Sequence, residues 1–134
     1  MNALKLEILT PEKAVLNEEA MQVELQGEYG RLGILPEHTS LIAKLDFGIL
    51  EYTKADKEIK KILCGKGVLE INNNHIMVLV DSAEDPENID VNRAEEAKKR
   101  AEERLKSKDS KIDTYRAELA LKRAIQRIQF SQRK

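Results

Sequence analysis

The sequence predicts a segregated α+β protein, in which an antiparallel β-sandwich or barrel is followed by an antiparallel hairpin of two helices. Up to about residue 85, short apolar segments alternate with turn residues, and after that apolar residues recur at helical spacing. Composition changes at the same point, since all six glycines and all three prolines lie at or before Pro86 and seven of the eight arginines follow it. We therefore expect a β domain over residues 1–86 and a helical domain over residues 87–134.

The β domain begins with a strand in which Leu4, Leu6 and Ile8 alternate with charged residues, and Thr10-Pro11 ends it. Similar segments follow at Met21–Leu25, Phe47–Thr53, Glu58–Leu63, Gly67–Ile71 and His75–Val80. The run 72–74, three asparagines, predicts a hairpin turn between the last two. Strands of this length at intervals of roughly ten residues are typical of an antiparallel sandwich or barrel.

The segment Gly30–His38 differs from ordinary strand sequence, because it contains Gly30, Gly33 and Pro36 within nine residues. Glycine allows backbone angles closed to other residues, and proline fixes a turn. The pattern predicts a β-bulge and a tight corner, an interpretation that requires no function.

The helical domain begins after Asp90, which can act as the N-cap of a first helix. The residues that recur at helical spacing in this helix are small: Ala94, Ala97, Ala101 and Leu105. A polar break at 107–110 follows, and Asp109 or Ser110 can cap a second helix. Because alanine burial contributes less than leucine burial, we expect the first helix to dock weakly and to be a movable part.

The two helices carry an internal repeat. Residues 93–104 and 116–127 match at eight of twelve positions with an offset of 23, and both have arginine at steps 0, 7 and 11. These steps fall on one helical face, so two arginine stripes could face each other across an anion. Arginine rows on Ala/Glu/Lys/Arg-rich helices are also typical of solvated faces, and this alternative stays open.

Charge and residue content argue against several classes of protein. Residues 1–87 hold nine basic and sixteen acidic residues, a formal charge of −7, whereas residues 88–134 hold fourteen and eight, a charge of +6. A nucleic-acid-binding arm would not interleave eight acids, and a membrane-surface helix would need a broader apolar face. No run approaches the roughly 18 apolar residues of a membrane span. The histidines lack metal-ligand spacing, so we expect no metal site, and no catalytic constellation indicates an enzyme.

Three stretches, Gly30–Leu41, Asp90–Ala94 and Arg116–Ala124, resemble the epsilon subunit of bacterial F-type ATP synthase. The resemblance runs from Leu4 to the last residue. It implies a β-sandwich of about ten strands and a two-helix hairpin in a non-catalytic rotor subunit. The sandwich would bind the gamma subunit and the c ring. The hairpin would either fold down or extend toward the alpha and beta catalytic subunits, where it inhibits ATP hydrolysis.

In several members of that family ATP binds the folded hairpin, so the resemblance implies a regulatory ligand rather than a required cofactor. The family's Asp-x-x-Arg-Ala motif matches here. The implied ATP site consists of Glu84, Ile89, Asp90, Arg93, Ala94, Arg100, Arg123 and Arg127. Forked guanidinium groups suit phosphate oxygens. Arg104 and Arg116 share the arginine stripes but lie outside this set.

The resemblance also implies two protein-binding surfaces. The inhibitory basic face consists of Arg116, Lys122, Arg123 and Arg127, and the loop facing the c ring and gamma consists of Gly30, Arg31, Gly33, Pro36 and His38. Many members have an acidic residue where this chain has Arg31. The expected location is the cytoplasmic face of the cell membrane, as a peripheral protein. The sequence leaves open whether the coupling ion is a proton or sodium.

Overall fold

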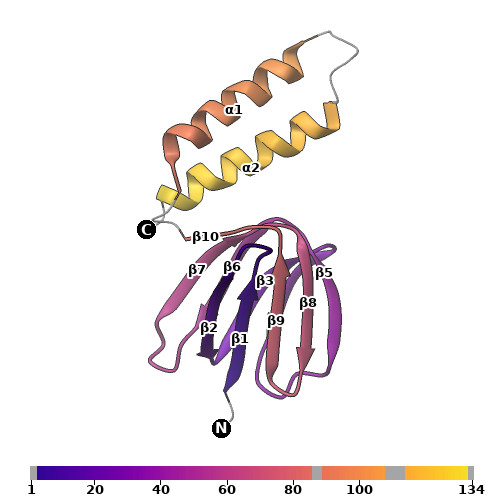
Figure 1. The fold of residues 1–134 in the computed structure, drawn as a ribbon, viewed down its shortest axis with the longest axis vertical. Helices are drawn as coiled ribbons and strands as arrows, with labels where there is room; N and C mark the ends of the chain where they lie inside the picture. The colour runs from indigo at the N-terminus through magenta and orange to yellow at the C-terminus, as the bar shows by residue number, and fades with distance from the viewer. Residues whose placement is uncertain (1–2, 86–88, 108–113, 133–134) are drawn as a thin grey trace. The chain divides into compact units, whose positions relative to one another are not determined.

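The computed structural model describes residues 3–85, 89–107 and 114–132, and it divides into two compact units, Met1–Asp85 and Pro86–Lys134. Figure 1 shows strands in the first unit and helices in the second.

Within residues 3–85 the first unit contains ten strands. They are β1 (Leu4–Leu9), β2 (Ala14–Ala20), β3 (Gln22–Gly27), β4 (Gly30–Ile34), β5 (Leu41–Leu45), β6 (Gly48–Thr53), β7 (Ile59–Cys64), β8 (Gly67–Asn72), β9 (His75–Val80) and β10 (Ala83–Glu84). They join in the order β10-β7-β6-β3-β5-β8-β9-β1-β2, with β4 paired to β3. The β1–β9 pair is parallel and its neighbours are antiparallel. The predicted sandwich of about ten strands is confirmed.

The sheet folds over on itself where β3 changes partner. Residues Gln22–Glu24 pair with β6, whereas Gly27 pairs with Leu45 of β5. The inward side chains from both parts then meet in one core, as the predicted alternation requires. Leu6, Leu69 and Val78 have no exposed surface.

Of two expectations for the β domain, one agrees with the structure and the other is partly wrong. Asn73 and Asn74 join β8 to β9 with φ angles of 49° and 63°, the two-residue turn in which asparagine tolerates positive φ. The interpretation of a bulge at Gly30–His38 is wrong for its first part, because Gly30–Ile34 pairs with β3 in unbroken register. The corner follows, and Glu37 has a φ of 70° there.

The second unit contains two helices within residues 89–107 and 114–132: α1 (Val91–Lys106) and α2 (Thr114–Gln132). They lie side by side and run antiparallel (Figure 1). The predicted N-cap is confirmed, because Oδ1 of Asp90 accepts a hydrogen bond from the Arg93 amide at 3.1 Å. The proposed caps of the second helix, Asp109 and Ser110, lie outside the described residues.

The packing of the two helices explains the sequence repeat. Ala94 and Ala101 of α1 are buried, and so are their repeat equivalents in α2, Ala117 and Ala124. We call these four alanines the seam. The small residues form the contact between the helices and allow them to approach closely, so the arginine stripes lie beside this contact.

Candidate functional site

The arginine stripes run beside the seam. At 100° per residue, Arg93, Arg100 and Arg104 lie about 80–120° around α1 from the seam alanines, all on the same side. The repeat gives the same angles in α2. The helices run antiparallel and their seam alanines face each other. The same angular offset from the seam therefore places both arginine stripes on one broad face of the hairpin. We call it the arginine face, formed by Arg93, Arg100, Arg104, Arg116, Arg123 and Arg127.

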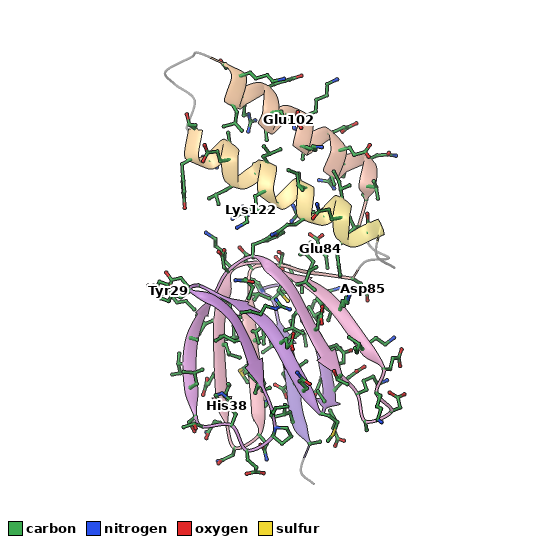
Figure 2. All side chains as sticks on the ribbon, turned by 180° about the vertical axis from the view of Figure 1, so that it is seen from behind. Tyr29, His38, Glu84, Asp85, Glu102 and Lys122 are labelled. Carbon is green, nitrogen blue, oxygen red and sulfur yellow. The ribbon has the colours of Figure 1, made fainter. Side chains whose placement is uncertain are left out.

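Two of the five acidic side chains of the described helix residues border this face, because Glu96 precedes Arg100 by four residues and Glu103 follows it by three. Glu95, Glu102 and Glu118 lie on the opposite broad face, about 80–100° from the seam in the other sense. Figure 2 labels Glu102 on α1, and its carboxylate is 3.9 Å from Nζ of Lys98. Six arginines from two helices on one face are the feature that suits an anion.

The arginines of this face differ in solvent exposure. Arg93, Arg100, Arg104 and Arg116 are exposed, whereas Arg123 and Arg127 are half-buried. Arg123 and Arg127 would therefore lose less hydration on binding an anion than a fully exposed pair would.

The other residues of the implied ATP site are divided between the units. Ile89, Asp90 and Ala94 belong to the hairpin unit, where Asp90 caps α1 and Ala94 is part of the seam. Glu84 lies on β10 of the sandwich, opposite Leu63.

Lys122 separates from the other members of the implied inhibitory basic face. It lies about a third of a turn around α2 from Arg116, Arg123 and Arg127. Figure 2 labels this side chain, which is exposed. The arginines thus share a face that Lys122 does not.

The five residues expected in one loop facing the c ring and gamma are spread along a strand. Gly30, Arg31 and Gly33 belong to β4, whereas Pro36 and His38 follow its end. Figure 2 shows Tyr29, next to Gly30, and His38 at opposite ends of the sandwich. The expectation of a single loop was wrong, because Gly30–Ile34 is regular β-structure rather than a turn.

Arg31 has a structural partner within the sandwich. Its guanidinium donates a hydrogen bond to the carbonyl oxygen of Ile49 on β6. Because β3 lies between β4 and β6, this bond spans the place where β3 leaves β6 for β5. Arg31 therefore has a structural role within the sandwich itself.

The opposite end of the sandwich carries a polar clasp. The Asn74 side chain accepts a hydrogen bond from the Glu37 amide at 2.6 Å and donates one to the Glu37 carboxylate at 2.9 Å. The two bonds offset the positive φ of Glu37 and fix the loop that carries His38.

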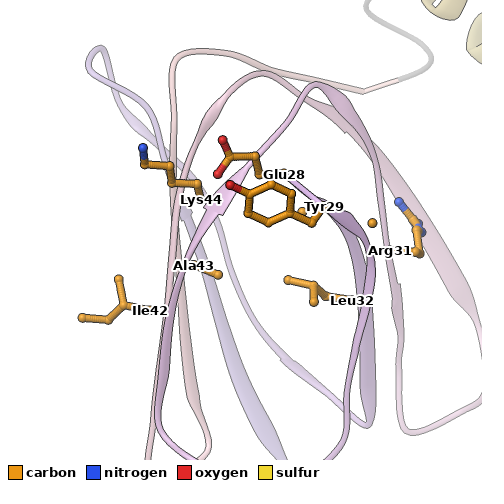
Figure 3. Close-up of a pocket in the computed structure, with 9 residues that line it drawn as sticks. Glu28, Tyr29, Arg31, Leu32, Ile42, Ala43 and Lys44 are labelled. Atoms are coloured by element: carbon orange, nitrogen blue, oxygen red, sulfur yellow. The ribbon is translucent and has the colours of Figure 1, made fainter.

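A pocket of about 400 Å³ lies at the β3–β4 turn (Figure 3). Tyr29, Leu32, Ile42 and Ala43 line it together with the charged Glu28 and Lys44. Tyr29 is 95% exposed, unusual for a large aromatic side chain.

An exposed apolar strip crosses the outside of the sandwich, and the sequence reasoning missed it. Ile42 of β5, Val68 of β8 and Leu79 of β9 point outward, and Val68 pairs directly with Leu79. The signal was present, because Val68-Leu69 and Val78-Leu79 are consecutive apolar residues, which means that both faces of a strand are apolar. Such strips mark protein interfaces.

The buried ionisable groups of the sandwich serve its core. Burial raises the pKa of the Cys64 thiol to about 12, and a thiol that stays protonated is unreactive. Burial also raises the pKa of Tyr52, whose hydroxyl donates to Glu18 at 2.9 Å. In the described parts of the chain, no His, Cys, Asp and Glu cluster could hold a metal ion, and no helix is long and apolar enough to span a membrane.

Comparison with known proteins gives the same division of the chain. The family model for the ATP synthase delta/epsilon chain β-sandwich domain matches residues 3–86, and that for its long α-helix domain matches residues 87–132. The chain belongs to the ATP synthase delta/epsilon family. It is a non-catalytic subunit of F-type ATP synthase.

Individual relatives carry the epsilon name. The ATP synthase epsilon chain of Desulforamulus reducens is 48% identical over 108 residues, 81% of each chain. That of Carboxydothermus hydrogenoformans is 49% identical over 102 residues, 76% of this chain and 75% of the relative.

Solved structures show the same fold at lower identity. A chain of the Euglena gracilis mitochondrial ATP synthase, in an OSCP/F1/c-ring structure, aligns with a TM-score of 0.82 at 20% identity, covering 92% of this chain and 78% of that one. A chain of the Tetrahymena thermophila central stalk and c ring aligns at 0.59 with 16% identity, covering 98% and 96%.

Proposed function

We propose that this epsilon chain regulates ATP hydrolysis through its hairpin, which senses ATP when folded and inhibits the catalytic subunits when extended. The observation that carries the proposal is the arginine face, where six arginines from two helices lie together. The hairpin forms a compact unit of its own, as a part that moves separately requires.

ATP binds at the open end of the hairpin, where α1 begins. In an antiparallel pair that buries the seam, Ala94 lies level with Ala124 and Ala101 level with Ala117. Arg93 then lies at a level between Arg123 and Arg127, so three guanidiniums converge on one place. We call these three the open-end group.

The expected affinity follows from these contacts. A charged hydrogen bond contributes roughly 1.5–3 kcal/mol net. Two or three of them, less ordering costs, give about −4 to −8 kcal/mol, a millimolar to micromolar dissociation constant. Asp90 and Glu84 repel phosphate, so they serve the adenine or ribose end or position arginines.

Inhibition uses the same charges. In the extended hairpin, Arg116, Arg123 and Arg127, with Lys122 on a neighbouring face, bind an acidic surface of the alpha and beta subunits. ATP and that surface compete for the arginines, so ATP shifts the hairpin by its differential affinity for the two states.

The sandwich couples the hairpin to the rotor. The apolar strip of Ile42, Val68 and Leu79 is the surface we assign to the gamma subunit, because exposed apolar side chains that gather on one face mark protein interfaces. The two ends of β4, at Gly30-Arg31 and at Pro36–His38, are separate contacts for the c ring and gamma. The chain is thereby peripheral at the cytoplasmic face of the cell membrane.

The test is calorimetric titration of the full chain with ATP, ADP and tripolyphosphate. We expect saturable binding that favours ATP and that Arg123→Ala weakens by at least about tenfold, the effect of one charged hydrogen bond. Lys122→Ala is the matched control, because Lys122 neighbours Arg123 in sequence but lies off the arginine face. The absence of a binding signal up to several millimolar ATP would overturn the proposal that the hairpin senses ATP.

A second assay separates sensing from inhibition. In the reconstituted F1 complex, Arg123→Ala should relieve inhibition of ATP hydrolysis as well as weaken ATP binding. Normal inhibition with lost ATP binding would show that the two functions use different residues.

A further inference from the structure

The sandwich has a free strand edge at β2. Among the described strands, β2 is the last in the strand order and pairs with β1 on one side only. The strand at the other end of the order, β10, contains two residues, whereas β2 runs from Ala14 to Ala20. An edge of this length presents N–H and C=O groups with which another strand can pair.

The middle of this edge carries an inward carboxylate. A register shift at the start of β2 interrupts its pairing with β1, and the regular part of the strand runs from Leu16 to Ala20. Glu18 is the middle residue of that part and lies opposite Leu6, which has no exposed surface. Because residues that lie opposite each other share one face of a sheet, Glu18 belongs to the core face of β2.

Tyr52 of β6 holds this carboxylate in place. Its hydroxyl donates a hydrogen bond to Oε2 of Glu18 at 2.9 Å, and the Tyr52 side chain is buried. Five strands separate β6 from β2 in the strand order, so the bond crosses the interior of the sandwich and does not join neighbours. Lys60, opposite Tyr52 on β7, pairs with Glu58 at 2.9 Å.

We propose that the inward carboxylate of Glu18, held by Tyr52, prevents β2 from pairing with the β2 strand of a second copy of this chain. Two identical strands that pair antiparallel with their core faces on the same side are related by a twofold axis. Full overlap of the regular parts places the two Glu18 side chains opposite each other. A shift by two residues places each Glu18 opposite Leu16 or Ala20 of the other copy.

Each of these registers is unfavourable because of the inward charge. Two carboxylates opposite each other repel, and a carboxylate against an apolar side chain loses water without gaining a hydrogen bond. Glu19, the next residue, lies on the outer face and is exposed, so water and salt screen its charge in such a dimer. The inward position of Glu18, and not the acidic character of the strand, therefore keeps the chain from pairing through β2. This inference does not depend on the proposed regulation by the hairpin.

The test removes both partners of the hydrogen bond. Glu18→Val alone would leave the Tyr52 hydroxyl buried without a partner, whereas Glu18→Val combined with Tyr52→Phe removes acceptor and donor together. In sedimentation equilibrium of the full chain, this double variant should dimerise at least about a hundredfold more strongly than the wild type, about tenfold for each of two equivalent positions.

Two further variants make the test specific. Glu19→Val removes the same charge from the same strand on its outer face, and it should dimerise no more than the wild type. Glu18→Gln keeps an acceptor for the Tyr52 hydroxyl, so it tests the charge if the double variant does not fold. It should dimerise about tenfold or more above the wild type, because two opposed amides bind each other instead of repelling. Far-UV circular dichroism checks that each variant is folded.

Amide hydrogen exchange then locates the contact. In the dimer, the added protection should lie in β2, because the amides of that strand that point away from β1 gain partners. Added protection elsewhere in the chain, with β2 unchanged, would show a different interface and contradict the proposal. Folded Glu18 variants that stay as monomeric as the wild type would overturn it. So would a Glu19→Val variant that dimerises as strongly as they do, because the charge of the strand rather than its inward position would then be decisive.

Discussion

The sandwich and the hairpin bury different kinds of surface. The sandwich core consists of large aliphatic side chains such as Leu6, Leu69 and Val78, which have no exposed surface. The seam of the hairpin buries four alanines. Full burial of a leucine contributes about 1.5–3 kcal/mol and each buried methylene-sized group about 0.8 kcal/mol, so the seam is held far more weakly than the core.

The difference matches the two tasks that we propose for the units. A subunit that turns with a rotor needs a rigid body, which the sandwich provides, whereas a regulatory arm needs a packing free energy that a ligand can overturn. Differential binding of a few kcal/mol shifts such an equilibrium almost completely. Alanine allows close approach of the helices without the stability that leucine would add.

The largest expected effect lies in the sandwich core. Leu69→Ala should destabilise the sandwich by about 2–5 kcal/mol, because it removes buried methyl groups and leaves a cavity. Urea unfolding measures the change. Ile42→Ala is the matched control on the neighbouring strand, where the side chain is 74% exposed and the change should be near zero. Equal effects at the two sites would contradict the assignment of inner and outer faces.

Alkaline pH should also weaken the sandwich more than the hairpin. The pKa of the Cys64 thiol is raised from 9.0 to about 12 by burial. Its protonated form therefore stabilises the fold fully below pH 9, and this contribution is lost at about 1.4 kcal/mol per pH unit as the pH rises toward 12. The raised pKa of Tyr52 adds to the loss above pH 10.

Urea unfolding from pH 8 to 11 measures this loss. The Cys64→Ala variant should show a shallower decline between pH 9 and 10 than the wild type, since tyrosine titrates later. Parallel curves for the two proteins would mean that the thiol ionises without unfolding the sandwich.

Most of the fold could be predicted because it follows from local patterns. Six strands are short apolar or alternating segments between turn residues, and the asparagine turn and the Asp90 cap depend on neighbouring residues. The strands β2, β4, β5 and β10 were missed. In β4, glycines suggested a turn, but pairing with β3 holds Gly30 and Gly33 in a strand. Tertiary pairing overrides local preference there.

The candidate site could be predicted in composition but not in geometry. Spacing placed the arginines of each helix on one face, which helical periodicity guarantees. It could not tell which face of each helix meets the other, because alanine and arginine stripes are adjacent in both. That Gly30 begins β4 whereas His38 follows its end also depends on pairing between distant residues.

Two glycine positions in the sandwich differ in the space available for a side chain. A Cβ atom on Gly67 would lie 1.8 Å from the carbonyl oxygen of Leu79, whereas one on Gly33 would have no atom within 4 Å. Gly67→Ala should cost about 3 kcal/mol, because backbone rather than a side chain must move. Gly33→Ala should be neutral or stabilise by about 0.4–1 kcal/mol through the unfolded chain. Thermal unfolding of the pair measures both, and a stable Gly67→Ala variant would refute the close approach.

A larger side chain in the seam should destabilise the hairpin and have little effect on the stability of the sandwich. Ala101→Leu should cost about 1–2 kcal/mol, because the larger side chain forces α1 and α2 apart. The helical signal in circular dichroism should melt at lower temperature, while the urea midpoint of the sandwich stays unchanged. Glu103→Leu, on an exposed outward position of α1, is the control for adding leucine. A shift of the sandwich midpoint by Ala101→Leu would show that the two units do not unfold independently.

The smallest expected effect concerns Asp90, which has two assigned roles at the start of the hairpin. Asp90→Ala should cost about 1 kcal/mol of helix stability, because the hydrogen bond to the Arg93 amide is lost. Asp90→Asn should restore the cap, since asparagine caps as well as aspartate does. ATP titration of the two variants then separates the roles. Full binding by Asp90→Asn means that Asp90 acts by fixing the backbone of Arg93. A folded Asp90→Asn variant that no longer binds ATP means that the carboxylate itself contacts the nucleotide. The negative charge of Asp90 then contributes more to ATP recognition than its role as the N-cap of α1 does.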